Sequence, residues 1–143
     1  MDKNMEVIKS LNQLVQGEYM SIEAFNIYIS KVRDDKVKTT FQQVQDQHRK
    51  NIQNLAHYIQ ELGGQPKEDT GLKGTMADMK INMQTSPEIA PSDYIKKAIE
   101  GMTKGIQMTE NLLRGDLDDS SRELVGEILQ KDRKSIEKLK SLI

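Results

Sequence analysis

IKSLNQLVQGEYMSIEAFNIYISKV, residues 8–32, is the stretch that decides the fold. Its apolar side chains recur on alternating steps of three and four residues, at Ile8, Leu11, Val15, Ile22, Phe25, Ile29 and Val32. This spacing predicts a helix with one face buried against other helices. The step between Val15 and Ile22 falls on Glu18. A buried carboxylate must be neutralised, paired or bound to a metal ion, because desolvating an isolated charge is costly. We therefore expect a partner for Glu18 inside the protein.

Three further stretches show the same spacing, so the sequence predicts four helices with buried faces. The second face consists of Phe41, Gln45, His48, Ile52, Leu55, Ile59 and Leu62. The third consists of Ile95, Ile99, Met102, Ile106, Thr109 and Leu113, and the fourth of Val125, Leu129, Asp132, Ile136, Leu139 and Ile143. Polar residues interrupt three of the four faces near the middle of each helix. The sequence thus predicts a polar site, or the remains of one, in the core.

Length and composition limit the class of protein. A chain of 143 residues fits one domain, residues 1–143, with a single core. A net charge of -1 argues against a nucleic-acid partner, which needs a basic surface. No apolar run approaches the roughly 20 residues of a membrane span, and no signal-peptide pattern opens the chain, so we expect no membrane partner and a cytoplasmic location. The absence of cysteine excludes disulfides, thiol catalysis and thiolate metal sites.

The ends of the first two helices are predicted from turn residues. The first helix is expected over about residues 4–33, with a tight connection at Asp34–Asp35. A connection this short makes the second helix antiparallel to the first. The second helix should continue to Leu62, because Gly63–Gly64 can adopt the left-handed conformation that ends a helix.

The second helix pair is predicted from capping residues. Ser92 is expected to cap a third helix that ends near Leu113. Ser120 and Glu123 have the spacing of a capping box and are expected to open a fourth helix that reaches the carboxyl terminus. Two antiparallel pairs joined by a long connection favour an all-α, antiparallel four-helix bundle with up-down-down-up order.

Residues 65–91 form the long crossover between the two pairs. Within it, four apolar residues on helical steps predict a short amphipathic helix laid across the bundle: Leu72, Met76, Met79 and Met83. A row of methionines can capture soft metals such as copper. We favour packing, because methionine far more often fills gaps in a core.

Three segments carry a resemblance to a known family. Residues 11–18, LNQLVQGE, resemble the pattern L-N-x-x-L-x-x-E of a first helix whose Glu binds metal. Residues 45–48, QDQH, resemble E-x-x-H with Gln45 in place of Glu. Residues 127–136 resemble a fourth-helix segment in which Asp132 replaces Glu and Ser135 replaces His. On these residues the chain resembles the ferritin-like superfamily, bacterioferritin in particular. Its layout is closer still to small bacterial ferritin-like domains of unassigned function.

The resemblance implies a di-iron carboxylate bundle that has lost ligands. The intact pattern supplies one Glu from each of two helices and Glu-x-x-His from each of the other two. The third-helix Glu is ambiguous here. Glu100 matches the family's ligand by alignment, whereas the apolar spacing directs Met102 inward at that level, and a thioether binds hard iron poorly. Glu110 only flanks the buried face.

The resulting candidate metal ligands are Glu18, His48, Asp132, Gln45 and Glu100. The cofactor implied by the resemblance is iron or another divalent metal, with a role in iron or oxidative-stress handling. Ferroxidase chemistry is not expected from this reduced set, and the sequence assigns no enzymatic reaction. A homo-oligomer is compatible with the resemblance.

The alternative is a structural or interaction bundle without a metal. Its core would hold Glu18 paired with protonated His48, or a proton shared between Glu18 and Asp132.

Overall fold

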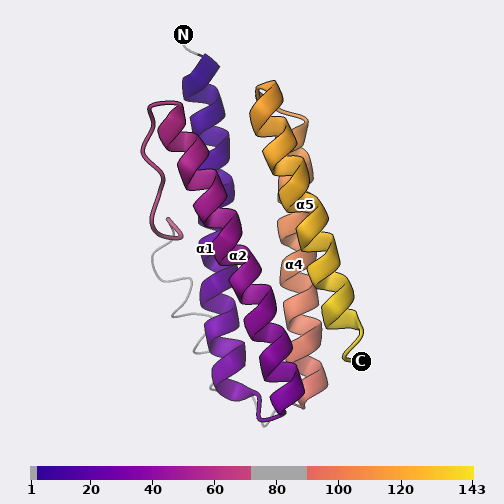
Figure 1. The fold of residues 1–143 in the computed structure, drawn as a ribbon. Helices are drawn as coiled ribbons and strands as arrows, with labels where there is room; N and C mark the ends of the chain where they lie inside the picture. Colours follow the sequence, from indigo (N-terminus) through magenta and orange to yellow (C-terminus); the bar gives the residue numbers. More distant parts are fainter. Residues whose placement is uncertain (1–2, 72–89) are drawn as a thin grey trace.

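The computed structural model describes residues 3–71 and 90–143 of the protein. They form four helices: α1 (Lys3–Lys31), α2 (Asp35–Glu61), α4 (Pro91–Leu113) and α5 (Asp119–Lys140) (Figure 1). The predicted all-α class is confirmed, since the described residues contain no strand. The short helix predicted around the methionine row lies at residues 72–89, outside the described residues. Within the described ranges, no helix is long and apolar enough to cross a membrane.

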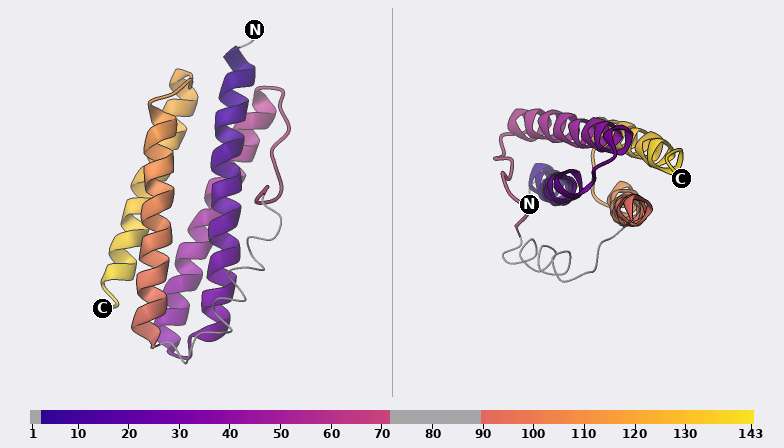
Figure 2. Two further views of the ribbon diagram at one scale, coloured as in Figure 1. Left: turned by 180° about the vertical axis from the view of Figure 1, so that it is seen from behind. Right: turned by 90° about the horizontal axis from the view of Figure 1, so that it is seen from below.

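The four helices occupy the corners of a bundle. α1 contacts α2 and α4, and α5 contacts α4 and α2. The end-on view in Figure 2 shows α2 beside α5 on one side of the bundle and α1 beside α4 on the other. Short loops join α1 to α2 and α4 to α5, so each of these pairs is antiparallel. In Figure 1, α2 and α4 run in the same direction and α1 and α5 in the opposite one, which confirms the predicted up-down-down-up order.

The described helix starts differ from the predicted ones in three places. Asp34 is the N-cap of α2 and its carboxylate accepts from the Val37 N–H at 3.0 Å, so Asp35 belongs to the helix rather than to the connection. α4 begins one residue before the predicted cap, at Pro91, because proline has no N–H to leave unpaired in a first turn. Ser92 therefore lies inside the helix.

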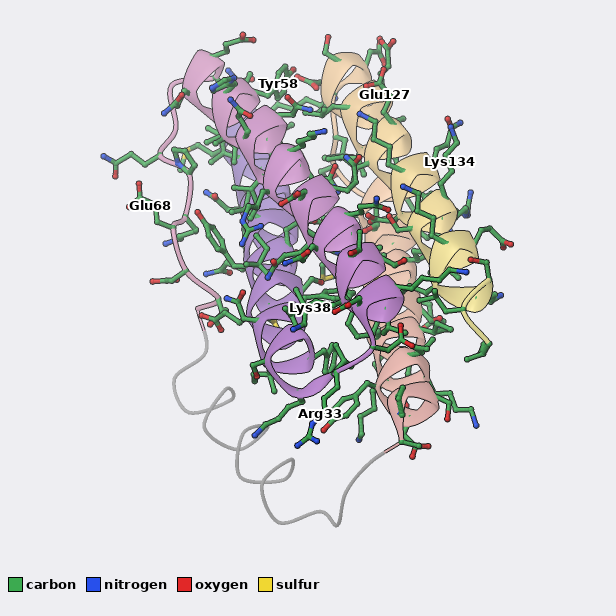
Figure 3. All side chains as sticks on the ribbon, turned by 60° about the horizontal axis from the view of Figure 1, so that its bottom comes forward. Arg33, Lys38, Tyr58, Glu68, Glu127 and Lys134 are labelled. Carbon is green, nitrogen blue, oxygen red and sulfur yellow. The ribbon has the colours of Figure 1, made fainter. Side chains whose placement is uncertain are left out.

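The start of α5 was also predicted wrongly. Asp118 is the N-cap, and its carboxylate accepts from the Ser121 N–H at 2.8 Å, while the Ser121 hydroxyl accepts from the Asp118 N–H at 3.0 Å. The Asp118 carboxylate also accepts from the hydroxyl of Tyr58 at 2.8 Å, which ties the end of α2 to the start of α5. Figure 3 labels Tyr58 near that end of α2. Ser120 lies inside the helix because Asp118, two residues earlier, already accepts the hydrogen bond from the Ser121 N–H of the first turn.

The exit from α2 is fixed by a glycine and by an asparagine of α1. Gly63 has a φ of 85°, as predicted for the residue that ends this helix. Beyond it, the Asn12 side chain donates to the Gln65 carbonyl at 3.1 Å and accepts from the Lys67 N–H at 2.8 Å. Asn12 thus holds the first residues of the crossover against α1 through one donated and one accepted hydrogen bond.

The core consists of two apolar clusters. One is built around Phe25 and Phe41, and the other around Leu11, Leu55 and Val125. Along α1 and α2, Glu18 and His48 fall between segments that belong to the two clusters, and on α5 Asp132 lies between Leu129 and Ile136 of the first cluster. The polar residues singled out by the sequence therefore form a layer inside the bundle and not a surface site.

Replacing Asn12 by Ala should lower the free energy of unfolding by about 2 kcal/mol, because two backbone groups of the crossover lose their buried partner. Chemical denaturation measures the change. Gln13→Ala, at the exposed neighbouring position, is the matched control and should change stability by less than about 0.5 kcal/mol. Equal effects of the two substitutions would contradict the anchoring role of Asn12.

Candidate metal centre

Three ionisable side chains from three helices meet in the polar layer. Glu18 of α1, His48 of α2 and Asp132 of α5 are 4%, 3% and 3% exposed. One ligand atom from each lies within 4.8 Å of the other two. The sequence placed these three residues at one level of the core, and the structure confirms that placement.

The imidazole of His48 is hydrogen bonded at both nitrogens. Nδ1 lies 2.6 Å from Glu18 Oε2, and Nε2 lies 3.0 Å from the sulfur of Met102. A neutral imidazole carries one N–H, whereas the imidazolium carries two and can donate to both partners. Burial alone would lower the pKa of His48, but the charge of Glu18, its hydrogen bond and the charge of Asp132 raise it above 6.5. In the absence of a metal, the geometry therefore favours a Glu18–His48 ion pair.

Asn51 joins the two carboxylates, although the apolar spacing of α2 does not predict it to be buried. Its side chain is fully buried, and its Nδ2 donates to Glu18 Oε2 at 3.2 Å and to Asp132 Oδ1 at 3.3 Å. Gln47 Nε2 in turn donates to Asn51 Oδ1 at 3.0 Å, which fixes the orientation of the amide. One amide group thus uses both of its N–H bonds to hold two acids together.

The spacing rule explains why Asn51 was missed. Counting apolar residues placed Ile52 on the buried face of α2, but Ile52 is only half-buried. Asn51 follows His48 by three residues, and positions three apart share a helix face. An asparagine at this spacing from a buried histidine was the available signal.

The pKa of the Asp132 carboxyl group is raised, which favours its neutral form. Its pKa is raised from 3.8 to about 7, first because burial penalises the charged form and second because Glu18 lies nearby. The charge of His48 and the hydrogen bond from Asn51 act in the opposite direction. Near neutral pH without a metal, Asp132 is therefore partly protonated.

The two remaining candidate ligands do not join the cluster. Gln45 is buried, but its amide nitrogen donates to the Ile22 carbonyl and to Asn26 Oδ1, both at 2.8 Å, on α1. Glu100 lies on the outer face of α4, with its side chain 70% exposed and 3.6 Å from Lys104 Nζ. Met102 occupies the inward position instead and is 4% exposed. The apolar spacing predicted this correctly, and the alignment of Glu100 with a family ligand was the poorer guide.

The residues present do not fit a di-iron centre. Two bridged cations need about four carboxylates and two imidazoles. The layer offers two carboxylates and one imidazole, with a thioether at the third-helix position and Ser135 where the resemblance implies the second His. All three ionisable ligands converge within one small space. They fit a single ion.

Comparison with solved structures defines the class of the fold. A two-domain protein from Anabaena variabilis, with DJ-1/ThiJ/PfpI-like and ferritin-like domains, has a TM-score of 0.78 and 23% identity. The match covers 99% of this chain but 36% of that protein, so this chain spans about a third of its length. A dodecameric thioferritin, the bacterioferritin-related protein of Bacteroides fragilis, has a TM-score of 0.73 and 16% identity over 99% of this chain and 85% of that one.

A third structure agrees with this class. A ferritin-like, diiron-carboxylate protein from Bacillus anthracis has a TM-score of 0.72 and 19% identity, over 99% of this chain and 98% of that one. At these identities the likeness concerns the fold, and the fold is ferritin-like.

The sequence itself belongs to a narrower group. Residues 6–115 match the model of a family described as a domain of unknown function, DUF2383, and the chain belongs to that family. None of the curated proteins matches the chain.

The raised pKa of Asp132 gives a pH prediction for the chelator-treated protein. The pKa of Asp132 is higher in the folded protein than in the unfolded chain, so neutral Asp132 is compatible with folding and its ionisation is not. The folded state therefore has its full stability below pH 3.8 and becomes less stable as pH rises through about 7. Asp132→Asn keeps the acceptor for Asn51 and removes the titration. The Tm of Asp132→Asn minus the Tm of the parent should therefore increase between pH 5 and pH 8, by about 5 °C or more.

Thermal melts at the two pH values measure this difference. Glu127→Gln removes an exposed carboxylate from the same helix and should leave the pH dependence of the parent unchanged (Figure 3). A Tm difference for Asp132→Asn that stays constant or narrows at pH 8 would show that Asp132 ionises normally.

Proposed function

We propose that the polar layer binds one divalent transition-metal ion through Glu18, His48 and Asp132. The observation that carries the proposal is the convergence of three buried ligand atoms, from three helices, within 4.8 Å of one another. Carboxylate oxygen and imidazole nitrogen suit iron and other divalent first-row metals. A bound ion would supply the positive charge that the two buried carboxylates otherwise obtain from protons.

The surrounding residues are arranged to support such a site. His48 turns Nδ1 towards the carboxylates and Nε2 towards Met102. A ligating Nδ1 requires the proton on Nε2, which then donates a hydrogen bond to the Met102 sulfur. Asn51 fixes the two carboxylates from the side, and such outer partners orient metal ligands. Binding would require His48 to lose its Nδ1 proton, so affinity should fall as pH decreases.

The proposed role is metal binding in iron or oxidative-stress handling, without ferroxidase activity. The role is supported by the ferritin-like fold together with the three converging ligands. Assembly into a homo-oligomer belongs to the same proposal. Its support is the Bacteroides relative, whose description names a dodecamer.

A metal-free interaction or structural bundle is the second candidate function. The observation that favours it is the 2.6 Å contact between His48 Nδ1 and Glu18 Oε2, together with the contact of Nε2 to Met102. An imidazolium satisfies both contacts without any ion. The two candidates differ in one measurable property, which is the response of stability to metal.

The central prediction concerns Glu18→Leu. Protein purified without chelator should contain about one divalent ion per chain, and added ion should raise its Tm by about 5 °C or more, since a ligand at a hundredfold excess over its Kd adds about 2.7 kcal/mol. Glu18→Leu should abolish both effects. Elemental analysis and thermal melts with Fe²⁺, Co²⁺ or chelator provide the measurement.

Glu100→Gln is the matched control, because it removes an exposed carboxylate and should leave metal content and the Tm response unchanged. If the parent carries no metal and its Tm does not respond to any ion, the metal proposal is wrong. In that case the ion pair remains, and Glu18→Leu should lower stability regardless of chelator because His48 loses its partner.

A further inference from the structure

A polar groove lies on the outside of the bundle between α2 and α5. Its volume is about 330 Å³, and its lining includes Lys50 of α2 and Lys134, Ser135 and Lys138 of α5. Figure 3 labels Lys134 on α5. The groove is separate from the buried cluster of Glu18, His48 and Asp132, and it presents basic groups where the cluster presents acidic ones.

The three lysines around the groove form no ion pair with any described residue. Within residues 3–71 and 90–143, no carboxylate lies within 4 Å of their ammonium groups, although Arg49, Lys104 and Arg133 each have one. Asp46 also lines the groove, but its carboxylate accepts from Arg49 Nη1 at 2.9 Å. Lys134 and Lys138 stand four residues apart on one helix face, where like charges repel. The groove therefore concentrates uncompensated positive charge.

Ser135 supplies a second, independent observation. Its side chain is 6% exposed and lines the groove. Among the described residues no hydrogen bond of this hydroxyl is found, and its oxygen is not one of the fully buried atoms that lack a partner, so the oxygen is open to the groove. Ser135 also replaces the second metal-binding His implied by the resemblance, so a small donor stands where a bulky imidazole would fill the space. The hydroxyl is an available donor at the floor of a basic groove.

The groove floor is connected to the interior. Gln47 lines the groove and donates to Asn51, which in turn donates to Glu18 and Asp132. Ser135 follows Asp132 by three residues on the same buried face of α5. A ligand in the groove would therefore lie about one helical turn from the buried carboxylate cluster.

We propose that the α2–α5 groove binds a small polyvalent oxyanion carrying phosphate or carboxylate groups. The three ammonium groups provide the counter-charge, and the Ser135 hydroxyl provides a directed hydrogen bond from the floor. Charge-assisted hydrogen bonds of this kind are stronger than neutral ones. The inference does not depend on a metal ion in the core, because none of the groups that contact the anion is a proposed metal ligand.

Inorganic phosphate and citrate are the two probes, titrated separately into chelator-treated, ¹⁵N-labelled full-length protein at constant ionic strength. We expect saturable chemical-shift changes at Ser135 and at the side-chain amide of Gln47 with at least one probe. Lys134→Gln/Lys138→Gln should weaken that affinity at least about tenfold, and Ser135→Ala about fivefold. Whichever probe binds more tightly identifies the phosphate or carboxylate class.

Lys96→Gln/Lys97→Gln is the matched control, because it removes the same charge from exposed positions on α4. It should change the affinity by less than about twofold, since screened charges outside the groove contribute little. The proposal is overturned if neither probe saturates the parent, or if the two double variants lose affinity equally. Circular dichroism melts verify that each variant is folded.

Discussion

Two carboxyl groups, those of Glu18 and Asp132, lie beside one imidazole and one amide inside a four-helix bundle. The need to balance their charge constrains which residues can surround them. Neither can be ionised in the core without a nearby positive charge or donor. His48 supplies the charge to Glu18 at 2.6 Å, and Asn51 supplies a donor to each acid. Asp132 has the weaker support, which agrees with a pKa raised to about 7.

The polar layer also has a structural cost. Apolar residues of similar volume would fill the same space without any desolvation penalty, and such replacements are often neutral or stabilising. The apolar clusters themselves are tightly packed, with Phe41, Leu55 and Val125 almost fully buried. A buried polar layer that apolar residues could replace argues for a ligand, and the convergence of three ligand atoms is the feature a metal ion would use.

Much of this arrangement could be predicted from the sequence. The apolar spacing alone placed Glu18, His48 and Asp132 inward. It also predicted that Met102 faces the core, whereas alignment with the ferritin-like family would have placed Glu100 there. The apolar spacing gave the wrong residue on α2, because it selects the apolar Ile52 for the buried face, whereas the polar Asn51 is the residue that is buried there. It also failed at the start of α5, where Asp118 and Ser120 are both good caps, and Asp118 is the one that bonds reciprocally with Ser121 and accepts from Tyr58. The groove could not be predicted, since it requires knowing that α2 and α5 are neighbours.

The same residues explain how the site differs from a di-iron centre. Met102, Gln45 and Ser135 stand where the resemblance implies two carboxylates and an imidazole, so the ligands that remain form one compact set. The most direct measurement is a crystal structure of the Co²⁺- or Zn²⁺-soaked protein with anomalous data collected at the metal edge. We predict one anomalous peak per chain, in contact with Glu18, His48 and Asp132. Two peaks about 3.5–4 Å apart would indicate an intact two-metal site, and no peak in the polar layer would contradict metal binding altogether.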